Sequence, residues 1–293
     1  MVHRNDHFFL MGSCFAEEIR VALNAELGEG HVGPDMSSVI FDPAVSRVDE
    51  LPERNHMNTY NAFSILQEIE RILGLWDPGP NDYWQLDGRV QCPYRRLVFS
   101  KTPEILAEVT AKLDTAFRAG FAAAEHFVFT YGMTEVFINR ASGKVANQRP
   151  RYGKAGVEQI LYHGSNFADN YAAITRTVDL ITAAKPEAKI FVTVSPVPLA
   201  RTFSDSDIVA ANTRSKSTLR AVLAEVAEAR PNVIYFPSYE AVLAAGDLAW
   251  MPDGRHVRRE VVDRITRAFV ASTFFSDDMT EPERESEGDA GQA

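Results

Sequence analysis

The feature that most constrains the fold of this chain is the alternation of short apolar runs with longer segments of helical spacing. Four runs rich in β-branched and aromatic residues predict core strands at 8–12, 127–131, 190–195 and 233–236. Continuous apolar runs are typical of strands that are buried on both faces. Strands that alternate with helices indicate a parallel sheet covered by helices on both sides, so the pattern predicts an α/β fold.

The segments between these strands carry apolar residues at helical spacing. Ile65, Ile69 and Ile72 share a face that ends at Gly74, and Thr102-Pro103 is a typical helix start. Further helices are predicted at 166–184, 206–229 and 257–273. Two hairpins are predicted, one over 85–90 with a turn at Asp87-Gly88 and one over 136–146 with a turn near Ser142-Gly143.

The composition indicates one domain followed by a tail. The 293 residues contain 45% apolar side chains, enough for a sizeable core, and no repeat or Pro/Gly/Ser linker divides them. We therefore expect a single domain over 1–275. Segment 276–293 has seven acidic residues against one arginine and almost no apolar side chain to bury, so we expect a disordered acidic tail.

Charge and cysteine content exclude several classes of protein. The formal net charge is −10, whereas general nucleic-acid binders carry a basic face. No run approaches the ~20 apolar residues of a membrane span, and the N-terminus lacks the pattern of a signal peptide. Cys14 and Cys92 cannot form a disulfide framework, and no Cys/His cluster has zinc spacing. We expect a cytoplasmic protein without a metal.

The first predicted strand ends in Gly12-Ser13-Cys14, and a helix begins at once. Ligands of open α/β sheets bind outside the carboxyl ends of the strands. The N-terminus of a helix lowers the pKa of a thiol and stabilises a developing oxyanion. The segment therefore predicts an activated nucleophile. The alternative is structural: Gly12 permits a tight turn, Ser13 caps the helix and Cys14 is a small buried hydrophobe.

A second candidate element lies before the last predicted helix, where Asp253 precedes His256 by three residues. This spacing can place the carboxylate against the imidazole, fix its tautomer and stabilise the imidazolium when the ring takes a proton. In the alternative, Asp253 caps the helix and His256 lies on its exposed first turn.

Together the two elements resemble the SGNH (GDSL-type) hydrolase superfamily. Gly12-Ser13-Cys14-Phe15-Ala16 also matches, letter for letter, the motif that names the related GSCFA family. The resemblance covers roughly residues 7–275. It implies a flavodoxin-like three-layer α/β/α sandwich of about five parallel strands, and chemistry on acyl groups. Supporting segments are Asn58-Thr59-Tyr60-Asn61, Tyr131-Gly132-Met133-Thr134-Glu135, Val194-Ser195-Pro196-Val197 and 212–216.

The resemblance also suggests which side chain attacks. Laid onto the superfamily's Gly-Asp-Ser, Gly12 takes the place of the glycine, Ser13 that of the aspartate and Cys14 that of the nucleophilic serine. Cys14 is therefore the preferred nucleophile, and Ser13 is the alternative by chemical type. His256 would be the base and Asp253 the residue that orients it.

For the oxyanion, the resemblance implies the backbone N–H of Cys14, a glycine N–H and an asparagine. This chain reads Gly132-Met133-Thr134-Glu135 where Gly-x-Asn-Asp would stand, so the asparagine is missing. The hydroxyl of Thr134 or the amide of Asn61 could replace it, although Asn61 could equally cap the helix at 62–73. Glu135 is a candidate acid of the pocket, although carboxylates at strand ends are usually solvated.

Three functions are compatible with these residues. The first is an esterase or deacylase that acts on a small-molecule or glycan ester without a cofactor. The second is an O-acyltransferase that acts on a glycan or its precursor in polysaccharide or glycoconjugate biosynthesis, with coenzyme A as the acyl donor. The pyrophosphate of coenzyme A, or another anion, could bind basic residues that are otherwise expected to be solvated. The third is a non-catalytic binding module, which the joint presence of Cys14, Asp253 and His256 disfavours. The basic residues are Arg95, Arg96, Arg149, Arg151 and Lys154.

Overall fold

The computed structural model describes residues 2–35, 58–86, 88–96, 98–147, 157–254 and 256–274. The predicted tail at 276–293 lies outside the described residues, as do Asp87 and the basic cluster of Arg149, Arg151 and Lys154.

The core of the protein is a five-stranded sheet in the order β11-β10-β6-β1-β2. All neighbouring strands are parallel, with Gly12 of β1 opposite Thr130 of β6. Counted along the chain, the order is the 2-1-3-4-5 order of flavodoxin-like folds, as predicted. The strands are β1 (Phe8–Gly12), β2 (Val32–Gly33), β6 (His126–Tyr131), β10 (Lys189–Val194) and β11 (Val233–Tyr235).

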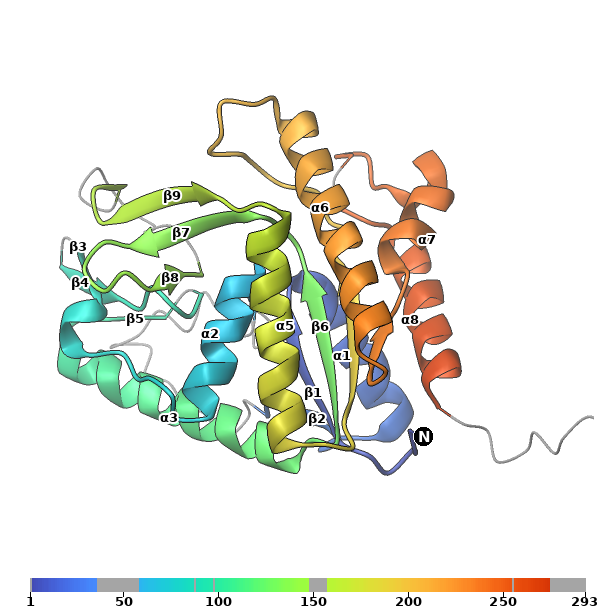
Figure 1. The fold of residues 1–293 in the computed structure, drawn as a ribbon, viewed down its shortest axis with the longest axis horizontal. Coiled ribbons are helices and arrows are strands. Elements are labelled where there is room, and N and C mark those ends of the chain that lie inside the picture. The colour runs from blue at the N-terminus through green and yellow to red at the C-terminus, as the bar shows by residue number, and fades with distance from the viewer. Residues whose placement is uncertain are drawn as a thin grey trace, which may run out of the picture.

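Helices cover both faces of this sheet because successive side chains of a strand point to opposite sides. Phe9 and Met11 pack against one group of helices, whereas Phe8 and Leu10 pack against the other. Figure 1 shows α2 and α5 on the near side of the sheet. The first group is α2 (Ala62–Ile72), α3 (Pro103–Ala123), α5 (Phe167–Ala184) and α6 (Ile208–Ala229), and the second is α1 (Cys14–Leu27), α7 (Ser238–Ala244) and α8 (Arg259–Thr273).

Two small antiparallel sheets extend beside the main sheet, on the left of Figure 1. They contain the two predicted hairpins. Asn139 joins them, because its Nδ2 donates to the carbonyl of Asp82 at 2.7 Å and its Oδ1 accepts from the indole of Trp84 at 3.3 Å. One sheet consists of β3 (Trp84–Leu86), β4 (Arg89–Gln91) and β5 (Phe99–Ser100), and the other of β7 (Glu135–Asn139), β8 (Val145–Ala146) and β9 (Ile160–Gly164).

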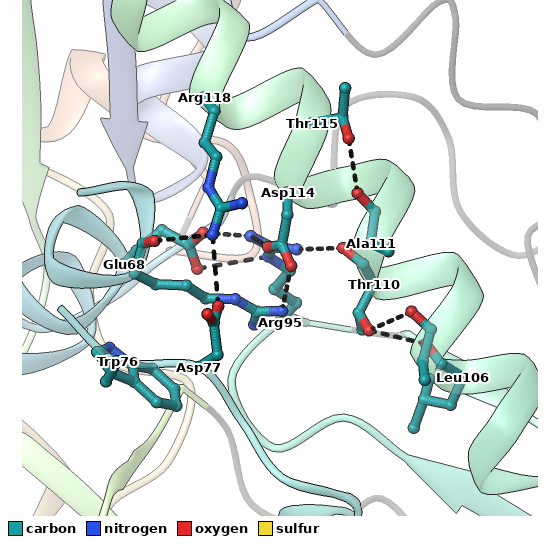
Figure 2. A network of polar contacts seen from close by, with 12 residues as sticks. Glu68, Trp76, Asp77, Arg95, Leu106, Thr110, Ala111, Asp114, Thr115 and Arg118 are labelled. Atoms are coloured by element: carbon teal, nitrogen blue, oxygen red, sulfur yellow. Dashed lines mark hydrogen bonds and ion pairs between the residues drawn. The ribbon is translucent and has the colours of Figure 1, made fainter. Parts of the chain in front are cut away.

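A buried ionic cluster joins α2, α3 and the loop after β4, as Figure 2 shows. The guanidinium of Arg95 is 3% exposed and pairs with Glu68 and, at 2.7 Å, with Asp114. Burial alone would lower the pKa of Arg95, but the two carboxylates raise it above its usual value. The expectation that Arg95 is solvated or binds an anion is therefore wrong, since carboxylates of the protein already occupy its guanidinium.

Candidate active site

The turn from Gly12 to Cys14 lies where the strand order reverses, between β1 and β6. Its backbone is closely fitted to β6: a Cβ on Gly12 would lie 2.4 Å from the carbonyl oxygen of Thr130, and Gly12 has φ +147°. The N–H of Thr59 donates to the Gly12 carbonyl at 2.7 Å. Ligands of flavodoxin-like folds bind at this switch point, so the turn stands where a substrate is expected.

The structure gives Ser13 and Cys14 different environments. Ser13 is 3% exposed, and its Oγ accepts from the N–H of Phe15 at 3.2 Å and hydrogen-bonds the Thr130 hydroxyl at 2.9 Å. It is the N-cap of α1, as one interpretation of the sequence expected. Cys14 is the first residue of α1 and its side chain is exposed. The alternative that Cys14 is a buried hydrophobe is therefore wrong.

Asp253 and His256 form the predicted pair. Oδ2 of Asp253 lies 2.5 Å from Nδ1 of His256, and Oδ1 accepts the His256 backbone N–H at 3.0 Å. The N-cap of α8 is Arg258, so the alternative in which Asp253 caps this helix is wrong. Because Nδ1 faces the carboxylate, Nε2 is the ring nitrogen left for proton transfer.

The helices that carry the two motifs are neighbours. Arg259, the first residue of α8, pairs with Glu18 at 2.7 Å, and Glu18 lies one helical turn after Cys14. His256 precedes Arg259 by three residues. The fold therefore places both motifs at the beginnings of adjacent helices.

Two residues proposed for the oxyanion site make hydrogen bonds within the protein. The N–H of Gly132 donates to the carbonyl of Tyr60 at 2.9 Å. The hydroxyl of Thr134 lies 2.9 Å from that of Ser215 on α6, and the Thr134 side chain is buried. At the carboxyl end of β6, Gly132 thus binds the 58–61 segment and Thr134 binds α6.

Asn61 and Glu135 are also buried. Asn61 caps α2, because its Oδ1 accepts from the N–H of Ser64 at 2.9 Å. Within the described residues no hydrogen bond from Asn61 Nδ2 is present, so this amide remains a candidate oxyanion donor. Glu135 was expected to be solvated, but it is buried. Its carboxylate accepts from the hydroxyl of Thr202 and, at 3.0 Å, from the N–H of Phe203.

Sequence reasoning assigned no role to Lys216, although it noted the segment 212–216. Its side chain is 0% exposed, and Nζ donates to the carbonyls of Gly132, Ser195 and Val197 at 2.7–2.8 Å. Burial lowers the pKa of Lys216 to about 7, and the charge of Cys14 acts to raise it. The signal was available: Lys216 falls at a core position of an amphipathic helix, three residues before Leu219.

Arg96, the second arginine of the pair considered for anion binding, lies near the 58–61 segment. Its guanidinium carbon is 5.8 Å from the centre of the Tyr60 ring. Among the described residues, no group of three or more His, Cys, Asp or Glu side chains could hold a metal ion. In the same part of the chain, no helix is both long and apolar enough to cross a lipid bilayer.

The similarity of this chain to known proteins is a family match and a distant structural resemblance. No curated protein matches the chain. Two solved structures resemble it at a TM-score of 0.39: a carbohydrate esterase family 3 protein from Talaromyces cellulolyticus (14% identity, 91% of this chain and 95% of the other) and a GDSL-like lipase from Parabacteroides merdae ATCC 43184 (9% identity, 93% and 97%). The GSCFA family model matches residues 7–269, so this chain belongs to the GSCFA family.

Proposed function

We propose that this protein is an esterase- or deacylase-type enzyme, with Cys14 as nucleophile, His256 as base and Asp253 as the residue that orients the base. One observation carries the proposal. At the switch point of the sheet, the thiol of Cys14 is exposed on the first turn of a helix, whereas the neighbouring Ser13 hydroxyl is buried and already hydrogen-bonded. A helix N-terminus favours the thiolate, which is the attacking species.

The reaction would proceed in two halves. Nε2 of His256 takes the thiol proton, and the sulfur of Cys14 attacks the carbonyl carbon of an ester. The tetrahedral intermediate collapses, the C–O bond breaks, and the leaving alkoxide takes the proton from His256. In the second half His256 deprotonates water, and the hydroxide attacks the thioester carbonyl. The C–S bond breaks and the departing thiolate takes the proton from His256, which leaves the carboxylic acid and the free thiol. Asp253 stabilises the imidazolium in both halves.

The developing oxyanion needs donors that are already in place. We propose the backbone N–H of Cys14 and the side-chain amide of Asn61. Asn61 supports this role because its oxygen is fixed by the cap of α2 while its Nδ2 makes no hydrogen bond to a described residue. For attack, Sγ of Cys14 and Nε2 of His256 should approach within about 4 Å.

Acyl transfer to a hydroxyl, with acyl-coenzyme A as the donor, would use the same covalent intermediate. Of the basic residues considered for the pyrophosphate, Arg95 is paired with Glu68 and Asp114 and is not available. We therefore place hydrolysis first and make transfer an outcome of the experiment.

The test is to trap the acyl-enzyme. The full chain is mixed with p-nitrophenyl acetate or with acetyl-coenzyme A, quenched in acid, digested and analysed by mass spectrometry. We expect the acetyl group on Cys14 and none on the buried Cys92, and we expect His256→Asn to slow its formation. Acetyl on Ser13, or a Cys14→Ala variant that is fully active, would refute the proposal. Faster turnover when a glycan hydroxyl is added would identify a transferase.

A further inference from the structure

Lys216 is a buried cation of unusual geometry at the carboxyl end of the sheet. Its Nζ lies between the carbonyls of Gly132, after β6, and of Ser195 and Val197, after β10. An ammonium group has three N–H donors, and here each has one carbonyl acceptor. A neutral amine would have only two donors and would turn its lone pair toward a carbonyl oxygen. The hydrogen-bond pattern therefore fits the charged form.

The charge of Lys216 has no carboxylate partner within the described residues, in contrast to Arg95 and Arg71. An unpaired charge in a protein interior is costly, so a nearby anion is strongly favoured. The ionisable side chain whose charge acts on Lys216 is Cys14. A thiolate at Cys14 would supply the missing negative charge.

The backbone shows how the two residues are connected. Gly132, whose carbonyl binds Lys216, packs against the nucleophile turn: a Cβ on Gly132 would lie 3.7 Å from the Cβ of Ser13. The same glycine donates its N–H to the carbonyl of Tyr60. The lysine thus holds the ends of β6 and β10 against the turn that presents Cys14.

We propose that Lys216 is a positioning residue of this site: its ammonium fixes the strand-end carbonyls around the Cys14 turn and keeps the Cys14 thiol ionised at neutral pH. This proposal concerns the same site as the proposed function. It rests on that function only for what the thiolate is used for, which is attack on an acyl group. Lys216 does not act as the base, because all three of its hydrogens are donated and an ammonium has no lone pair to accept a proton.

The first test measures the thiol directly. The rate of alkylation of Cys14 by iodoacetamide is followed from pH 5 to 10 in the wild type and in Lys216→Met. We expect the midpoint of the profile to rise by at least about one unit, so that alkylation at pH 7 falls about tenfold. The buried Cys92 should not react in the folded protein.

Lys185→Met is the matched control. Lys185 also donates from Nζ to a backbone carbonyl, that of Ala122 at 2.6 Å, but it follows α5 at the opposite end of the sheet. Lys185→Met removes the same charge from the protein and should leave the pH profile of Cys14 alkylation unchanged. An unchanged profile in Lys216→Met, or an equal shift in both variants, would overturn the proposal.

Lys216→Met removes three buried hydrogen bonds and could fail to fold, so a second measurement uses Cys14→Ala, whose substitution is on the surface. Lysine side chains labelled with 13C at Cε are titrated by NMR in the wild type and in Cys14→Ala. The pKa of Lys216 should be the lowest among the lysines of the wild type. It should fall further in Cys14→Ala, because the thiolate that raises it is absent. If the lysine titration is the same in the wild type and in Cys14→Ala, the ion pair between Lys216 and Cys14 is refuted. Neither measurement uses an acyl substrate, so failure here leaves the acyl-enzyme experiment to decide the proposed function separately.

Discussion

Replacement of Ser13 by alanine should destabilise the protein without stopping its chemistry. The Oγ of Ser13 caps α1 by accepting from Phe15 N–H, and loss of such a cap costs about 1 kcal/mol. It also hydrogen-bonds the fully buried hydroxyl of Thr130, and a lost buried hydrogen bond costs about 1 kcal/mol more. The second cost is as low as about 1 kcal/mol because Thr130 Oγ1 still accepts from the Ser13 N–H at 2.8 Å. We expect the free energy of unfolding to fall by about 2 kcal/mol, twice the value for a cap alone.

Cys14→Ala should show the opposite behaviour. Its side chain is exposed and lies on the first turn of α1, so the free energy of unfolding should change by less than about 0.5 kcal/mol. Turnover of an activated ester should be abolished. Cys14→Ser should be a poor replacement, because a hydroxyl is much harder to deprotonate than a thiol in the same place.

The assay combines urea unfolding, followed by tryptophan fluorescence, with ester hydrolysis by the same preparations. Thr130→Val is the partner variant for Ser13→Ala, because it removes the shared hydroxyl–hydroxyl hydrogen bond from the side of β6, together with the one that Thr130 Oγ1 accepts from the Ser13 N–H. In a double-mutant cycle the two losses should be less than additive. The reasoning is refuted if Ser13→Ala keeps its stability and loses its activity, since Ser13 would then be the nucleophile and not a cap.

Three further predictions concern other parts of the molecule. Asp253→Asn should lower turnover by about two to four orders of magnitude, because an amide no longer stabilises the imidazolium, while the melting temperature stays the same since the pair is exposed. Glu68→Gln should lower the free energy of unfolding by about 3 kcal/mol, because Arg95 stays buried with one carboxylate fewer. The control Glu108→Gln, an exposed change on the neighbouring helix α3, should cost almost nothing. Equal losses in the two variants would show that burial of the Arg95–Glu68 pair does not matter. Deletion of 276–293 should leave melting temperature and activity intact, because this acidic segment has almost no apolar surface to bury; a large drop in melting temperature would contradict the prediction.

The three central strands of the main sheet, β1, β6 and β10, could be predicted because they are buried on both faces. The runs 8–12 and 127–131 are apolar at nearly every position, and the structure places them side by side in β1 and β6. The elements that were not predicted lack this signal. β2 has only two residues, β9 is largely exposed, and α7 is a seven-residue helix, so none shows a period long enough to recognise.

The candidate site was predictable where residues act within one segment, and not where they meet through the fold. His256 follows Asp253 by three residues, and this spacing alone indicated their contact. Helical spacing places Lys216 at a core position, but it binds carbonyls that are 19 to 84 positions away in the chain, and no local pattern indicates which ones. Arg95 was misjudged for the same reason: a hairpin arginine looks solvated until α2 and α3 are packed against it.

Each of the five residues of the Gly12–Ala16 turn can be compared with the contacts that it makes. Gly12 is required by its positive φ and by the close approach of β6. Ser13 caps α1 and is buried. Phe15 is 2% exposed in the core under α1, and Ala16, 6% exposed, is a small residue in the same packed turn. Cys14 is the exposed member of the five, so packing and backbone geometry give no reason for a thiol there. Its position on the first turn of a helix, at the switch point of the sheet, gives a chemical one.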